Sequence, residues 1–311
     1  MEELVDENST NSAQKIKHLV ISGGGLNGFC YYGVLRDSNM NGVWDINDIE
    51  TIYGCSIGSM LAAITALRYD WSDIDDYILK RPWEQVFESD LLSMLNSISD
   101  KGIYNIRQIE AIITPLLLGK DLSPDITLNE FYQTTKIEIH MFTTDIHSFK
   151  SVDLSYKTHP DWRVVDAIYA SSAIPVVFAP HTDGITYYYD GAFFTNYPLL
   201  NCIENGANPN ETLGIASSVL QNKRGIIVPD STMFDCMSVV LENIVHNILR
   251  SAYGGKIGVE YTIEPVSTTL SGSYNAITKK EERARLIAIG SESFRIAHAN
   301  LATTESQDEN V

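Results

Sequence analysis

The sequence predicts a three-layer α/β fold, in which a mostly parallel central sheet carries helices on both faces. One observation is that apolar runs of strand length alternate with longer segments of helical period along the chain. A second is that glycine-containing turns follow the first two apolar runs, where a strand would lead into a helix. With 311 residues and 44% hydrophobic composition, the chain is also long enough to bury a substantial core.

The predicted elements follow in strand–helix order. The first two buried strands are residues 18–22 (HLVIS) and 49–54 (IETIYG). Helices 29–37 (FCYYGVLRD) and 59–69 (SMLAAITALRY) follow them. Three further strands and one helix are expected downstream: strands 136–146 (KIEIHMFTTDI), 185–190 (ITYYYD) and 211–220 (ETLGIASSVL), and helix 161–172 (DWRVVDAIYASS).

The chain reads as a single domain over residues 15–302, with polar and disordered ends at 1–14 and 303–311. Residues 72–118 are predicted to be a helical insertion after the second strand–helix unit. Residues 232–250 place their apolar side chains on one helical face, which predicts a helix packed on the core. A lid or a membrane contact is the alternative for that helix.

Charge and cysteine content limit the partners and the cellular location that the sequence predicts. Forty acidic residues against 22 basic ones give a net charge of −18, which disfavours nucleic acid and anionic lipid as partners. Any lipid contact should therefore rest on apolar groups. The four cysteines lack metal-ligand pairing, the first residues are acidic and polar, and no apolar stretch is long enough to span a bilayer. These features predict an intracellular protein, cytoplasmic or peripheral to membranes.

A glycine run follows the first predicted strand. Gly23, Gly25 and Gly28 match the G-x-G-x-x-G spacing of a dinucleotide site, where backbone N–H groups at a helix start bind negative charge. A dinucleotide fold also needs an acidic residue at the end of the second strand, but Asp48 and Glu50 lie before that strand or at its start. An NAD- or FAD-dependent oxidoreductase remains an alternative.

The second predicted strand leads instead into GCSIG, a G-x-S-x-G centred on Ser56. A serine on a sharp strand-to-helix turn is exposed and strained, and glycines two residues away, here Gly54 and Gly58, relieve the crowding. If the first two strands are parallel neighbours, the N–H groups of Gly24 and Gly25 can face an acyl oxyanion formed at Ser56.

A serine nucleophile needs a base. His246 and His298 lie on polar helical faces, although a serine–aspartate–histidine esterase using one of them stays open as an alternative. Asp190 ends an aromatic strand and precedes Gly191 and Ala192, which makes it the more interesting candidate. An ordinary Asp-Gly turn is the competing explanation.

GGGLNG, GCSIGS, ASSAIPVVFAP and DGAFFTNYP, in this order and spacing over residues 17–220, resemble the patatin-like phospholipase family. The resemblance implies a patatin-like fold related to the α/β-hydrolases and a serine–aspartate dyad of Ser56 and Asp190. Its implied oxyanion loop contains Gly23, Gly24 and Gly25, and Asn27 and Gly28 complete the implied oxyanion hole.

The resemblance implies hydrolysis of glycerophospholipids or acyl glycerols through an acyl-enzyme, without a cofactor, and aromatic residues beside Asp190 suit such substrates. The family usually has Arg or Lys where this chain has Asn27, next to Gly28. The Asn27 amide could donate to the oxyanion instead. A catalytically weak or silent lipid-binding relative is therefore the main alternative.

A calcium loop is a weaker alternative. Six residues mimic the ligand and glycine positions of an EF-hand loop, but the last ligand is a short Asp: Asp37, Asn39, Asn41, Gly42, Asp45 and Asp48. The segment must also lead into the second strand, which favours a polar turn. The sequence therefore predicts no metal site.

Overall fold

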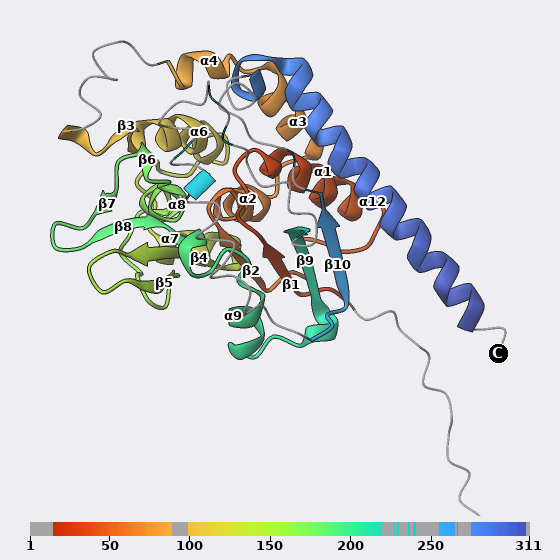
Figure 1. Cartoon of the computed structure of the whole chain (residues 1–311). Coiled ribbons are helices and arrows are strands. Elements are labelled where there is room, and N and C mark those ends of the chain that lie inside the picture. The colour runs from red at the N-terminus through yellow and green to blue at the C-terminus, as the bar shows by residue number, and fades with distance from the viewer. Residues whose placement is uncertain are drawn as a thin grey trace, which may run out of the picture.

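An eight-stranded sheet forms the centre of the computed structural model, in the order β10-β9-β1-β2-β4-β8-β7, and β5 pairs with β4 outside this path. The structure describes residues 15–88, 99–218, 255–264, 266 and 275–308, and the single positions 227, 229, 236, 239 and 240. Helices lie on both sides of the sheet (Figure 1), so the predicted three-layer α/β fold is confirmed.

Five strands are parallel neighbours across the middle of the sheet. They are β1 (His18–Ile21), β2 (Thr51–Cys55), β4 (Glu138–Asp145), β9 (Thr212–Ser217) and β10 (Val259–Ile263). Antiparallel strands complete one side: β5 (Lys150–Leu154), β7 (His181–Thr182) and β8 (Tyr187–Asp190). Because β1 and β2 are parallel neighbours, the turns that follow them emerge at the same edge.

The two faces of the sheet are covered unequally. The larger core packs beneath α1 (Asn27–Met40), α2 (Ile57–Ala66) and α8 (Val164–Ser172). A smaller cluster on the other face joins Tyr53 and Phe142 of the sheet to α9 (Leu199–Glu204). Side chains alternate between the faces along each strand, so β2 and β4 contribute to both clusters.

The long helix α12 (Lys280–Asp308) crosses α1 on the outside of the larger face (Figure 1). Contact is close because glycines meet backbone: a Cβ on Gly290 would overlap the carbonyl oxygen of Cys30, and one on Gly33 would overlap that of Ile287. The helix continues past residue 303, where the sequence predicted a disordered tail. Tertiary packing of its earlier turns on α1 supports a helix that local composition did not predict.

The segment predicted as a helical insertion is only partly helical. Its described part contains α3 (Trp71–Lys80), α4 (Trp83–Val86) and α6 (Ile106–Leu118). It also contains a short strand, β3 (Gly102–Tyr104), which pairs in parallel with β6 (Val176–Phe178) as a separate small sheet. The remaining helix, α7 (Leu128–Thr135), precedes β4. The predicted helix over 232–250 falls almost wholly outside the described residues.

Within the described part of the chain, no helix has both the length and the apolar character that crossing a bilayer requires.

Candidate active site

Ser56 occupies a one-residue turn between β2 and α2. Its backbone has φ 54° and ψ −124°, a conformation that costs a non-glycine residue about 1–3 kcal/mol. The turn closes tightly, because a Cβ on Gly54 would overlap the backbone of Gly58, and one on Gly58 would overlap the carbonyl oxygen of Ile21. Both glycines of the G-x-S-x-G therefore allow α2 to begin directly against β1 and β2.

Sheet register brings Asp190 to the same level as Ser56. Cys55, the last residue of β2, pairs with Phe142 of β4, and the next residue of β4, Thr143, pairs with Asp190 of β8. Ser56 and Asp190 thus lie on either side of β4, and the Ser56 hydroxyl donates to Asp190 Oδ2 over 2.6 Å. Both residues are buried, at 5% and 4% exposure.

The turn after Asp190 orients its carboxylate. The backbone N–H of Ala192 donates to Asp190 Oδ1 over 2.8 Å, so the aspartate caps the short 3₁₀ turn that follows it. A Cβ on Gly191 would overlap the carbonyl oxygen of Phe142, so only glycine lets this turn lie against β4. The Asp-Gly-Ala sequence is thereby explained by packing as well as by chemistry.

Burial raises the pKa of the Asp190 carboxyl to about 6. Removal from water penalises the ionised form, and this effect exceeds the opposing hydrogen bonds from Ser56, Ala192 and Cys55. The Cys55 thiol lies beneath the carboxylate, with Sγ 3.9 Å from Oδ1. A carboxylate with this pKa remains mostly ionised at neutral pH and accepts a proton more readily than an exposed aspartate.

Ser171 is a site residue that the sequence did not single out. Its hydroxyl donates to the Phe142 carbonyl over 2.6 Å, accepts the Ser56 backbone N–H over 2.9 Å, and lies 2.8 Å from the Ser59 hydroxyl. One hydroxyl thus uses its full hydrogen-bonding capacity around the strained turn. Its place in the quoted ASSAIP stretch was the available signal, but sequence spacing could not reveal its partner.

The glycine loop after β1 offers two backbone donors. The Gly23 N–H donates to the carbonyl of Asn196 over 2.8 Å, so Gly23 is part of this loop but does not direct its own N–H into the site. Gly24 and Gly25 donate their N–H groups to no residue in the described ranges, and neither does Ile57 at the start of α2. Gly25 has φ 52°, a left-handed conformation that glycine adopts without strain.

Asn27 and Gly28 hold the glycine loop and the two following helices in position. The Asn27 side-chain amide donates to the Gly24 carbonyl over 3.1 Å, and its oxygen accepts the Val266 N–H over 2.9 Å. One of the two amide N–H groups is thus used to hold the glycine loop. A Cβ on Gly28 would overlap the Ile57 side chain, so this glycine lets α1 and α2 approach.

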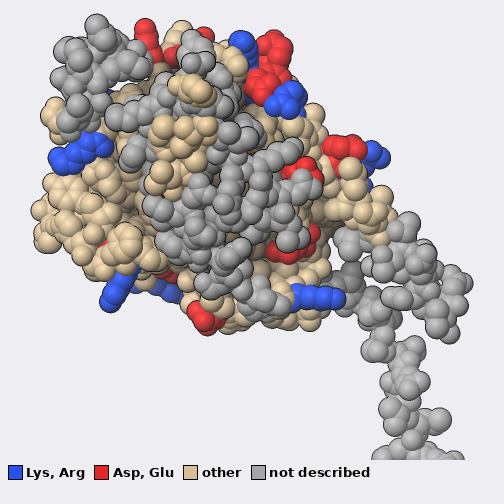
Figure 2. All heavy atoms as spheres, viewed as in Figure 1, with Lys and Arg blue, Asp and Glu red and all other residues tan. Residues whose placement is uncertain are grey.

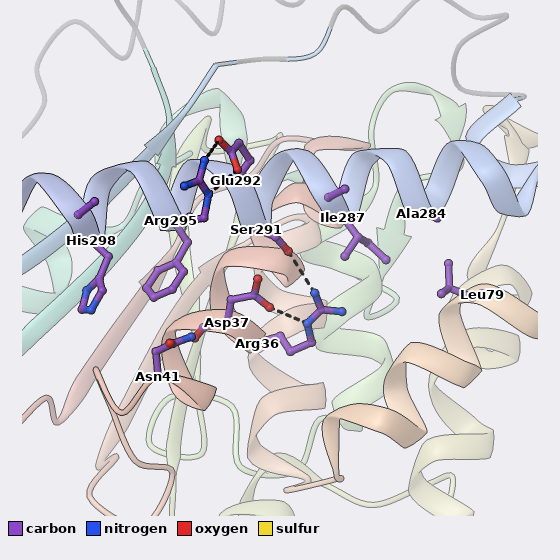
Figure 3. Close-up of a pocket in the computed structure, with 13 residues that line it drawn as sticks. Arg36, Asp37, Asn41, Leu79, Ala284, Ile287, Ser291, Glu292, Arg295 and His298 are labelled. Atoms are coloured by element: carbon purple, nitrogen blue, oxygen red, sulfur yellow. Dashed lines mark hydrogen bonds and ion pairs between the residues drawn. The ribbon is translucent and has the colours of Figure 1, made fainter.

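The histidine alternatives gain no support from the described residues. His246 lies outside the described ranges. His298 stacks on Phe294, with ring centroids 5.2 Å apart, and lines a groove of about 710 Å³ between α12 and α1 (Figure 3). Asp37 and Asn41, near the end of α1, line the same groove. Asp190 instead lies at the Ser56 hydroxyl.

The residues that mimic a calcium loop do not converge. Asp37 and Asn39 belong to α1, and the Asn39 side-chain amide donates to the Trp44 carbonyl over 2.9 Å. Asp48 pairs instead with Lys15, at 2.9 Å. Among the described residues, no group of three His, Cys, Asp or Glu side chains is placed to hold a metal ion.

Comparison with known proteins gives a consistent result. A family model described as patatin-like phospholipase matches residues 19–203. A probable lipid hydrolase of Invertebrate iridescent virus 6 is 26% identical over 183 residues, which cover 59% of this chain and 62% of the relative. An uncharacterized protein of Acanthamoeba polyphaga mimivirus is 27% identical over 196 residues, covering 62% of this chain and 64% of the relative.

Among solved structures, VipD from Legionella pneumophila has a similar fold, with a TM-score of 0.56 and 17% identity. The match covers 91% of this chain and 66% of VipD. The chain therefore spans less than two thirds of the length of each of these three proteins.

Proposed function

The chain belongs to the patatin-like phospholipase family, and from this premise we propose that it is a lipid acyl hydrolase with a Ser56–Asp190 dyad. The observation that carries the proposal is the 2.6 Å hydrogen bond between the two side chains at a strained strand-to-helix turn. The substrates we propose are glycerophospholipids or acyl glycerols. Tyr187, Phe193 and Phe194 add aromatic surface on either side of Asp190.

In the acylation step, the Asp190 carboxylate accepts the Ser56 hydroxyl proton while Oγ attacks the carbonyl carbon of the ester. The carbonyl electron pair moves to oxygen, and the resulting oxyanion is stabilised by the backbone N–H groups of Gly24, Gly25 and Ile57. When the intermediate collapses, the C–O bond to the alcohol breaks. The departing alkoxide takes the proton from Asp190, and an acyl-enzyme remains.

Water completes the cycle. It gives a proton to Asp190 as its oxygen attacks the acyl-enzyme, and collapse of the second intermediate breaks the bond to Ser56 Oγ. The proton returns to Oγ, and the fatty acid is released. In other hydrolases the loss of one oxyanion donor costs about 2.7–4 kcal/mol, so the backbone donors are expected to contribute as much as the base.

The test is to react the purified chain with a fluorophosphonate probe and to locate the adduct by mass spectrometry. Hydrolysis of p-nitrophenyl esters of varied acyl length and of labelled phosphatidylcholine is measured in parallel. We expect the adduct at Ser56, and product release at least about 100-fold slower in Ser56→Ala and Asp190→Asn. Ser72→Ala and Asp76→Asn, both exposed on α3, are matched controls. Equal product release by all variants would contradict the dyad.

The silent lipid-binding relative is the alternative that the same experiment separates. It rests on Asn27, which provides a neutral side chain where the family usually has a cation. Because the Asn27 amide donates to the Gly24 carbonyl, the glycine loop after β1 is stabilised without that cation. Vesicle binding with neither an adduct at Ser56 nor fatty-acid release would favour the silent alternative.

A further inference from the structure

Two turns lie side by side at one end of the sheet. The β4–β5 turn (residues 146–149) and the β7–β8 turn (residues 183–186) are neighbours because β4 and β8 are paired, with Asp145 opposite Tyr188. The Ile146 N–H also donates to the Tyr187 carbonyl over 3.1 Å. We call residues 146–149 and 183–186 together the docking edge.

In each of these turns an aspartate side chain accepts hydrogen bonds from the backbone of the turn. Asp145 accepts the N–H groups of His147 and Ser148, at 2.8 and 3.3 Å. Asp183 accepts those of Ile185 and Thr186 in the same pattern, at 2.9 and 2.8 Å. These bonds are made to the turn itself, so both carboxylates are directed back to the backbone.

Large apolar side chains are left at the tips. Ile185 is 85% exposed and Phe149 is 59% exposed, which are high values for such residues. Phe149 also has φ 53°, a left-handed conformation in which glycine or asparagine would be less strained. A bulky aromatic residue is thus held outward at a position where neither local conformation nor core packing requires it.

Charges beside the docking edge nearly cancel. Asp145 and Asp183 are the acidic residues within 145–150 and 182–188, and Lys150 is the basic one. Lys101 adds a second positive charge, with Nζ 6.0 Å from the ring centroid of Tyr187, and the exposed Asp100 directly before it adds a third negative one. In Figure 2 the region that carries β5, β7 and β8 is largely without charged side chains, while acidic groups gather elsewhere on the same face. This near neutrality contrasts with the net charge of −18.

We propose that the docking edge inserts its apolar tips into the surface of a zwitterionic phospholipid membrane. A nearly neutral edge suits a zwitterionic surface, and exposed Ile and Phe side chains are stabilised by leaving water there. The edge is also connected to the dyad. Phe149 packs edge-to-face on Phe194, with centroids 4.9 Å apart, and Phe194 closes the 3₁₀ turn that begins after Asp190.

This inference builds on the proposed lipid substrate, but its test does not depend on turnover. Binding of the full chain to phosphatidylcholine vesicles is measured by co-sedimentation for Ile185→Asp and Phe149→Asp. The affinity of each variant for the vesicles is expected to fall by at least about tenfold, because an inserted apolar side chain is replaced by a charge. Met40→Asp and Leu118→Asp change side chains that are 68% and 55% exposed elsewhere, and should bind as the unsubstituted chain does.

A second measurement covers the case in which a charged variant fails to fold. In Ile185→Trp, the new indole is expected to be quenched by phosphatidylcholine brominated on its acyl chains, whereas that of Leu118→Trp is not. Binding retained by both edge variants, equal loss in the controls, or equal quenching at both positions would overturn the proposal. Binding that requires the anionic lipid phosphatidylserine would also overturn it, because the proposed partner is a zwitterionic membrane surface.

Failure of the docking proposal is distinguishable from failure of the proposed function. If the docking edge is wrong but the dyad is right, the phosphonate adduct forms at Ser56 while vesicle binding is insensitive to Ile185 and Phe149. If the dyad is wrong, no adduct forms, and vesicle binding can still depend on the edge.

Discussion

Replacing Asp190 by asparagine should stabilise the fold while removing activity. The carboxylate is ionised at neutral pH in a site where burial disfavours charge, so it is held at a cost in folding free energy. Asparagine has nearly the same shape and carries no charge. Its oxygen can still accept the Ala192 N–H, and its amide nitrogen can donate to the Ser56 oxygen, so both contacts of the native carboxylate are kept, the second with donor and acceptor exchanged.

The magnitude follows from the pKa shift. A folded-state pKa of about 6 against an ordinary value of 3.8 corresponds to about 3 kcal/mol at pH well above 6. Because the folded-state pKa is raised, Asp190 does not lower the free energy of unfolding below pH 3.8, where it is protonated in both states. As the pH rises through about 6 the carboxyl ionises in the folded protein, and the free energy of unfolding reaches its full loss. The variant should therefore exceed the unsubstituted chain by about 3 kcal/mol near pH 8 and by roughly half as much near pH 5.

Urea unfolding of both proteins at these two pH values measures the effect, and Asp76→Asn on exposed α3 serves as the control. The informative quantity is the difference between Asp190→Asn and the unsubstituted chain at each pH, since other titrating groups cancel in it. A variant no more stable than the unsubstituted chain near pH 8, or a difference that does not shrink toward pH 5, would refute the reasoning.

Three further predictions concern the same site. Hydrolysis of a soluble ester should fall about tenfold per pH unit below about 6 as Asp190 is protonated, and a pH profile that stays flat down to about 4.5 would contradict this. Ser171→Ala leaves the buried Ser56 N–H without its partner, so we expect the free energy of unfolding to fall by about 1–3 kcal/mol and phosphonate labelling to be slower. If both values were unchanged, Ser171 would not be needed to hold the Ser56 turn. Gly58→Ala forces a Cβ onto backbone and should be more destabilising than Gly25→Ala, where open space leaves only a left-handed strain of about 1 kcal/mol; thermal unfolding ranks the two variants, and the reverse order would be inconsistent with the packing described.

Residue types at local turns were predictable from the sequence. A tight turn between a strand and a helix needs small residues at fixed positions within a few residues of each other. GGGLNG and GCSIG have glycines at such positions, so these two segments indicate their turns directly. The alternation of apolar runs likewise predicted the α/β layers. The same local patterns identified Ser56 and Asp190 as candidates, although their catalytic roles remain to be tested.

Other features depend on contacts between residues distant in sequence, and these only the tertiary structure decided. The bond from the Ser56 N–H to Ser171 joins residues 115 positions apart, and that from Val266 to Asn27 joins residues 239 apart. The sequence therefore could not show that the Asn27 side chain binds the Gly24 carbonyl and the Val266 N–H, or that the Gly23 N–H donates to Asn196. Burial of Asp190 and the pairing of two exposed turns arise in the same way. Local sequence specifies backbone conformation, whereas hydrogen-bond partners, pKa values and shared surfaces are set by what the fold brings together.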